Sequence, residues 1–121
     1  MIVGLGIDVV DVARFERAVA RTPGLAQRLF ADDELVVSGS PRPVRSLAAR
    51  WAAKEAAAKA LGTIEGQRWR DLVVASDAAG APSLVLGGAW AALATSRGVT
   101  SVHVSLTHDA GVAAAVVVAE A

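Results

Sequence analysis

Two carboxylates in this sequence, Asp8 and Glu55, lie in segments that consist mostly of apolar or small residues. Asp8 lies inside the apolar run IVGLGIDVV, and Glu55 lies in the alanine-rich run RWAAKEAAAKALG at 50–62. If the two carboxylates meet, each raises the pKa of the other, and a hard divalent cation relieves the repulsion. Mg²⁺ typically takes one or two carboxylates together with phosphate oxygens. The pair therefore indicates a metal site, on the condition that the two segments pack together.

The position of Glu55 on its helix supports this interpretation. Side chains four residues apart lie nearly above one another, so Leu47 and Trp51 precede Glu55 on one stripe and Lys59 follows it. Because a Leu and a Trp are expected to be buried, Glu55 should lie at the rim of packed structure and need a cation or hydrogen-bond donors. The alternative is a solvated helix face, since Glu55 and Lys59 form a favoured i, i+4 ion pair.

Cations on the same helix would suit phosphate groups, and they are Arg50, Lys54 and Lys59. His108, in the turn-like segment THDAG, is a further candidate, although a histidine at a hairpin tip is more often solvated than catalytic. The sequence contains no GxxxxGK[ST], GxGxxG, HExxH or GxSxG motif. Hydrolase and nucleotide-binding sites of those types are therefore not expected.

The elements that must position these residues follow from apolar periodicity and turn signals. We expect strands at 2–10, 69–76, 83–86, 99–106 and 112–119, and helices at 12–22, 25–30, about 44–61 and 90–96, with loops at 38–43 and 77–82. Asp11 is expected to cap the first helix, Asp32 and Asp33 to cap a turn that carries Glu34, and Gly62 to end the long helix. Helices early and strands late, with one strand at the front, predict an α+β fold.

The first strand has two unlike faces. Its odd-numbered positions are apolar, and we expect that face to lie on the core: Val3, Leu5, Ile7 and Val9. The other face carries Gly4 and Gly6 beside Asp8, so we expect backbone, solvent or a ligand to approach it closely.

Composition bounds the class of protein. A length of 121 residues predicts one domain, 1–121. Twelve basic and twelve acidic residues give a formal net charge of zero, which argues against generic nucleic-acid binding. No apolar run approaches the roughly 18 residues needed to span a membrane, and the N-terminus does not read as a signal peptide. The absence of cysteine excludes disulfides and thiolate metal sites and is compatible with a reducing compartment.

The chain resembles the holo-[acyl-carrier-protein] synthases, the short, trimeric class of 4′-phosphopantetheinyl transferases. The matching motifs run from end to end: GIDVVDVARF at 6–15, the F-x-x-x-E of residues 30–34, RWAAKEAAAKALG at 50–62, the G-x-P turn at 80–82, and VHVSLTHD at 102–109 followed by AAAVV at 113–117. The resemblance implies a small antiparallel sheet packed with a long helix, a cytoplasmic enzyme of fatty acid biosynthesis, and a homotrimer with active sites between subunits.

The resemblance also implies roles for individual residues. Mg²⁺ would be held by Asp8 and Glu55, with the pyrophosphate of coenzyme A on Lys59. The rest of the coenzyme A pocket would comprise Arg50, Gly80, Ala81, Pro82, Ser105, Thr107 and His108, and the acidic carrier protein would meet Arg14, Arg17 and Arg21. The proton of the carrier serine would pass to Glu34, His108 or a metal-bound water. In the family the loop at 80–82 usually carries Lys or Arg in the middle, so Ala81 removes one cation beside the nucleotide.

Trimer formation has weaker support from the residues themselves. The last two strands are apolar on one face and partly apolar on the other, as at Ala113 and Ala115 opposite Val112, Ala114 and Val116. A sheet that is apolar on both faces must be covered on both. Three sheets meeting at an axis would cover the second face, whereas the alternative is that small alanines tolerate exposure.

Two other functions stay open on the residues alone. A non-catalytic scaffold would use the arginine face of residues 14–21 to bind an acidic partner, and it would not need Asp8 and Glu55 to converge. A Mg²⁺-dependent hydrolase of a nucleotide diphosphate would need the metal pair but no carrier-binding face.

Overall fold

The computed structural model describes all residues from 1 to 121. The elements are β1 (Ile2–Asp11), α1 (Val12–Arg21), α2 (Leu25–Leu29), α3 (Asp32–Leu35), β2 (Val36–Val37), β3 (Ser40–Pro41), α4 (Val44–Leu61), a 3₁₀ turn η1 (Trp69–Asp71), β4 (Leu72–Ser76), β5 (Pro82–Leu86), α5 (Gly88–Ser96), β6 (Ser101–Asp109) and β7 (Val112–Glu120). The expected α+β class is confirmed. None of the helices has the length and apolar character to cross a membrane.

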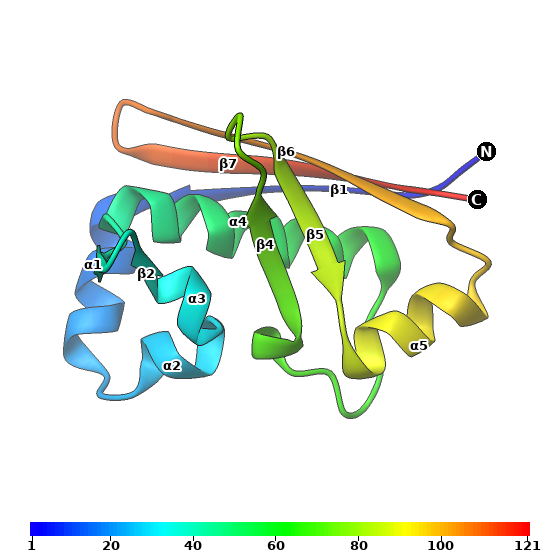
Figure 1. Ribbon diagram of the computed structural model, residues 1–121, viewed down its shortest axis with the longest axis horizontal. Coiled ribbons are helices and arrows are strands. Elements are labelled where there is room, and N and C mark those ends of the chain that lie inside the picture. Colours follow the sequence, from blue (N-terminus) through cyan, green and yellow to red (C-terminus); the bar gives the residue numbers. More distant parts are fainter.

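The main sheet is antiparallel and has the strand order β1-β7-β6. The hairpin of β6 and β7 was expected, and β1 pairs along almost its whole length with β7, as in Asp8 opposite Ala115. Helix α4 lies along one face of this sheet, and in Figure 1 all of the helices lie on that same side. The other face, which contains the exposed side chains of Leu5, Ile7 and Val9, is covered by no element of this chain.

The expected core face of β1 was therefore wrong. Leu5, Ile7 and Val9 are 64%, 63% and 63% exposed, whereas Gly6 and Val10 on the opposite face are buried. The physical reason is that β1 packs on α4 through backbone, since its two glycines leave room for the alanines of the helix. The apolar face of β1, with Leu5, Ile7 and Val9, is therefore exposed.

The long helix α4 begins and ends where the sequence predicts. Nine alanines and leucines of this helix, together with other apolar side chains, form the core, and Gly62 ends the helix with a left-handed φ of 96°. Helix α1 is also as expected, because the Asp11 carboxylate accepts a hydrogen bond of 2.8 Å from the backbone N–H of Arg14.

Several expected boundaries differ from the structure. The strand expected at 99–106 is β6 at 101–109, so His108 lies in the strand opposite Ala113 and not at the hairpin tip. Residues 69–71 form a 3₁₀ turn and not the start of a strand, since Trp69 packs edge-on against Trp51 at 4.7 Å between ring centroids. The expected loop at 38–43 includes half of a two-residue ladder, in which Val37 pairs with Ser40. The N-cap of α3 is Ala31, and Asp32 and Asp33 already lie in its first turn.

Candidate functional site

Asp8 and Glu55 do converge, because β1 lies directly along α4. Glu55 is half-buried, and the Asp8 side chain is 12% exposed. The Lys59 ammonium lies beside them and donates to the Ile7 carbonyl at 2.9 Å and to Asp8 Oδ1 at 3.3 Å. Two carboxylates and one half-exposed ammonium thus share one edge of the contact between strand and helix.

One atom of this group lacks a partner. Asp8 Oδ2 is buried and accepts no hydrogen bond, which is costly for a carboxylate oxygen unless a cation or donor reaches it. No cluster of three or more His, Asp or Glu side chains is present, so the chain offers two carboxylates at most. Two carboxylates with one unsatisfied oxygen fit Mg²⁺, which keeps several positions for water and phosphate oxygens.

The environment of Glu55 perturbs its ionisation. Burial, followed by the negative charge of the neighbouring Asp8, raises the pKa of Glu55 to about 7, and the positive charge of Lys59 opposes this rise. A carboxyl group that shares a site with a second carboxylate gains from a cation more than an isolated one does. The electrostatics therefore favour a divalent ion between the two side chains.

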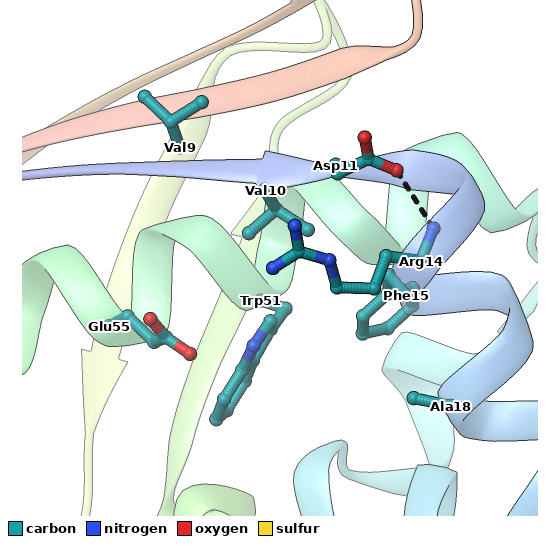
Figure 2. Close-up of a pocket in the computed structure, with 8 residues that line it drawn as sticks. All are labelled: Val9, Val10, Asp11, Arg14, Phe15, Ala18, Trp51 and Glu55. Carbon is teal, nitrogen blue, oxygen red and sulfur yellow. Dashed lines mark hydrogen bonds between the residues drawn. The ribbon is translucent and has the colours of Figure 1, made fainter.

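A pocket of about 290 Å³ opens beside Glu55. Figure 2 shows the Glu55 carboxylate and the Trp51 ring on α4 facing Val10 and Phe15, with the Arg14 side chain extending across from α1. The walls are apolar, and the charged groups stand at the edges.

Arg50 lies elsewhere, in a second pocket of about 470 Å³ formed by α4, β4 and the segment around β2. The Arg50 side chain is buried and donates to Ser46 Oγ at 2.8 Å and to Ser76 Oγ at 3.3 Å, while its Nε has no partner. Burial and the nearby charge of Arg42 lower the pKa of Arg50. Two close guanidinium groups with an unpaired buried N–H are a setting that an anion would stabilise.

The grouping of Lys54 with the phosphate-binding cations was wrong. Its ammonium is completely buried and donates to Glu34 Oε1 at 2.6 Å, to the Leu29 carbonyl at 2.7 Å and to the Trp69 carbonyl at 3.0 Å. The reason is helical geometry, since Lys54 points roughly 100° away from Glu55 and into the core.

Glu34 is not placed to accept a substrate proton. Its side chain is also 0% exposed, and besides Lys54 it accepts from the backbone N–H groups of Ala31 at 2.9 Å and Val74 at 3.0 Å. Both oxygens are thus occupied within the fold. The structure gives Glu34 an internal role and no support as a base.

The remaining candidates are spread over the chain. Gly80 and Ala81 are exposed at the tip of the β4–β5 hairpin, where the Asp77 carboxylate accepts from the N–H of Ala81 at 2.9 Å, and Pro82 begins β5. Ser105 and Thr107 are exposed on the uncovered face of the sheet, in the rows of Ile7 and Val9. His108 lines a third pocket together with Arg45, at the far end of β6.

The basic face of α1 is as expected. Arg14, Arg17 and Arg21 are all exposed, and Arg14 also lines the pocket beside Glu55. Sequence reasoning missed Arg42 and Arg45, which line the pockets of Arg50 and His108. The signal was present in the segment PRPVR at 41–45, where two arginines stand at the entry to α4.

Comparison with known proteins gives the family. The profile of the 4′-phosphopantetheinyl transferase superfamily matches residues 4–117. A holo-[acyl-carrier-protein] synthase from Clavibacter sepedonicus is 57% identical over 99% of this chain and 97% of its own.

Solved structures agree with this assignment. The crystal structure of holo-[acyl-carrier-protein] synthase from Neisseria meningitidis is 34% identical, with a TM-score of 0.88 over 100% of both chains. The enzyme from Helicobacter pylori, solved in complex with coenzyme A, is 30% identical, with a TM-score of 0.82 over 96% of this chain and 99% of that one.

Proposed function

This chain belongs to the holo-[acyl-carrier-protein] synthases of the 4′-phosphopantetheinyl transferase superfamily, and we propose that it moves 4′-phosphopantetheine from coenzyme A to a serine of an apo acyl carrier protein. The serine hydroxyl attacks the phosphorus that bears the pantetheine, the bond from that phosphorus to the nucleotide breaks, and 3′,5′-ADP leaves. The carrier would serve fatty acid biosynthesis. The observation that carries the proposal is the convergence of Asp8, Glu55 and Lys59 in a chain of this family.

Asp8 and Glu55 are proposed to hold Mg²⁺, which fits the partnerless Asp8 Oδ2 and the raised pKa of Glu55. When bound, the ion would offset negative charge on the pyrophosphate. Lys59, whose side chain is 57% exposed, can turn from the Ile7 carbonyl to the same pyrophosphate. The work of these residues is positioning and charge neutralisation.

Arg50 and Arg42 are proposed to bind a further phosphate of the nucleotide, because Arg50 has a buried N–H without a partner and Arg42 repels it. The loop of residues 80–82, Gly-Ala-Pro, has no cationic side chain, so these guanidinium groups would supply the cations.

A site shared between copies explains why the other predicted residues lie apart. Ser105 and Thr107 lie on the uncovered sheet face, opposite to the face that carries Asp8. A second copy packed on that face would allow residues of two subunits to form one coenzyme A pocket. We therefore propose a homotrimer with active sites at the interfaces, in which His108 is the remaining side chain that can bind the diphosphate or receive the serine proton.

Mass spectrometry tests the reaction directly. Apo-carrier protein incubated with coenzyme A, Mg²⁺ and this chain should gain the mass of one phosphopantetheine group, and a carrier whose acceptor serine is replaced by alanine should gain none. A scaffold would bind the carrier without any change of mass. A hydrolase would consume coenzyme A equally well without the carrier, so chromatography of the nucleotide products separates the three functions.

A further inference from the structure

The distance between β1 and α4 is set by two residues that have no side chain. A Cβ built on Gly6 would lie 1.9 Å from the carbonyl oxygen of Ala56, and a Cβ built on Gly4 would lie 1.9 Å from the carbonyl oxygen of Ala60. Both obstacles are backbone atoms of α4, so no rotation of a side chain could relieve either contact. Any larger residue must move the strand away from the helix.

The same contact fixes the two carboxylates. Two residues along β1 span about 6.6 Å and four residues along α4 span about 6.0 Å, so the strand and helix stay nearly in step. Gly4 faces Ala60, Gly6 faces Ala56, and the next step brings Asp8 to the turn that contains Glu55. Gly6 is two residues from Asp8, and Ala56 directly follows Glu55.

We propose that Gly6 is a positioning residue for the metal pair, because its missing side chain sets the separation of Asp8 and Glu55, and that Gly4 supports it one turn further along α4. This inference rests on the proposed metal site. Mg²⁺ demands nearly ideal geometry at about 2.0–2.1 Å from its ligands. Moving a Cβ from 1.9 Å to the 3.4 Å of ordinary contact exceeds that tolerance by far.

Other contacts resist local adjustment of the strand. The Arg97 guanidinium donates to the carbonyls of Ala60 and Leu61 at 2.8 and 2.7 Å and to the Val3 carbonyl at 2.8 Å, which ties the end of α4 to the start of β1. Hydrogen bonding to β7 also holds β1 along one edge. A side chain at position 6 would therefore displace β1 near Asp8, where the link to α4 is the long, 57% exposed side chain of Lys59, which donates to the Ile7 carbonyl at 2.9 Å.

The experiment measures binding of Mn²⁺, as a substitute for Mg²⁺, to the full chain in the presence of 3′,5′-ADP by electron paramagnetic resonance. Gly6→Ala should weaken Mn²⁺ binding about tenfold or more, as loss of ligand support does at other metal sites. Leu72→Ala is the control, because Leu72 is completely buried in β4 and its loss destabilises the fold away from the metal pair. It should lower the melting temperature and leave Mn²⁺ affinity within about twofold.

A second-site change separates positioning from general destabilisation. Asp8→Glu lengthens the carboxylate by one carbon–carbon bond, about 1.5 Å, and so spans the gap that Gly6→Ala creates. The double variant should bind Mn²⁺ more tightly than either single variant. Any of three results overturns the inference. They are wild-type Mn²⁺ affinity in Gly6→Ala, a loss of affinity in Leu72→Ala as large as that in Gly6→Ala, and no gain of affinity in the double variant. If Gly6→Ala does not fold, Gly4→Ala with and without Asp8→Glu is judged by the same outcomes, with an expected weakening of about threefold.

The proposed metal site fails in a different way. If wild-type protein does not bind Mn²⁺, or if Asp8→Ala binds it equally well, the site assignment itself is wrong. If wild-type binding depends on Asp8 and Glu55 but not on Gly6, only the positioning role is lost.

Discussion

Lys54 and Glu34 form an ion pair at 2.6 Å in which both side chains are completely buried. Glu55, the next residue after Lys54, points instead to the edge where β1 carries Asp8. Two adjacent residues of α4 therefore have different roles. Lys54 joins the helix to α2, α3 and η1, whereas Glu55 faces the proposed metal site. Removing one partner of such a buried pair leaves an uncompensated charge, which is far worse than losing both.

We therefore expect Lys54→Met to lower the free energy of unfolding by about 3–5 kcal/mol. Lys54→Met combined with Glu34→Gln should lose less than the sum of the two single changes, because no charge is left unpaired. Urea denaturation at one fixed protein concentration measures both. A loss below about 1 kcal/mol in Lys54→Met would show that the pair contributes little.

The local signals in the sequence predicted the elements well. Ala-rich sequence with Gly62 behind it placed α4 within its observed bounds, and Asp11 marked the start of α1. Periodicity also found the β6–β7 hairpin. These features depend on residues that are close together in the chain, so one sequence is enough to predict them.

What failed was orientation, which depends on distant partners. The rule that apolar residues face the core predicted the wrong side for Ile7 and Val9. The face of β1 that packs on α4 is the one with Gly6, and the apolar face with Ile7 and Val9 is exposed. The charge of Lys54 suggested a role in phosphate binding, but its side chain is buried with Glu34, a partner that is 20 residues away in the chain. The sequence alone could not show that Asp8 and Glu55 lie close together, because that depends on how β1 packs against α4.

Asp8→Ala and Glu55→Ala should each reduce transfer to the carrier by about 10²-fold or more, because each removes a charged group that positions the reacting phosphates. The folds should persist, since neither side chain is part of the apolar core. Intact-mass assays give the rate and circular dichroism checks the fold. Transfer near the wild-type rate at ordinary Mg²⁺ in either variant would refute the site assignment.

The raised pKa of Glu55, about 7, predicts the pH dependence of metal binding. The ion requires the carboxylate, so below about pH 7 protons compete with it. The Mg²⁺ concentration for half-maximal activity should rise about tenfold per pH unit in that range, whereas it should stay constant well above pH 7. A flat profile between pH 5.5 and 7 would contradict the perturbed carboxyl.

The same group affects the stability of the metal-free protein. Because the folded-state pKa lies above the ordinary value of 4.5, the native state binds the extra proton between about pH 4.5 and 7. Its contribution to stability is therefore full below pH 4.5 and declines as the pH rises through 7. Melting temperatures in EDTA should show this decline, and Glu55→Gln should lessen it.

Arg14→Glu combined with Arg17→Glu should raise the apparent KM for the carrier at least tenfold, which is much more than it raises the KM for coenzyme A. Charge reversal on an exposed helix face acts on association with an acidic partner and makes it less sensitive to salt. Arg28→Glu, on the neighbouring helix α2, is a control that reverses one charge outside this face. Unchanged carrier kinetics at low salt would mean that the arginines are only a solvated helix side.

The uncovered sheet face predicts the assembly. Leu5, Ile7 and Val9 leave a continuous row of exposed apolar side chains, a pattern that marks an interaction surface. Light scattering on dilute protein should give the molar mass of a trimer, with and without coenzyme A. Ile7→Glu should dissociate it and abolish transfer, since a charge cannot be buried there without a partner.

Val85→Glu provides the matched control for this last change. Val85 is 55% exposed and apolar like Ile7, but it lies on β5, in a different sheet. It should remain trimeric and active, because the same charge then stays in solvent. Ile7→Glu is the decisive variant: if it is a monomer that transfers phosphopantetheine at the wild-type rate, the site is complete within one chain, and both the trimer and the shared pocket are refuted.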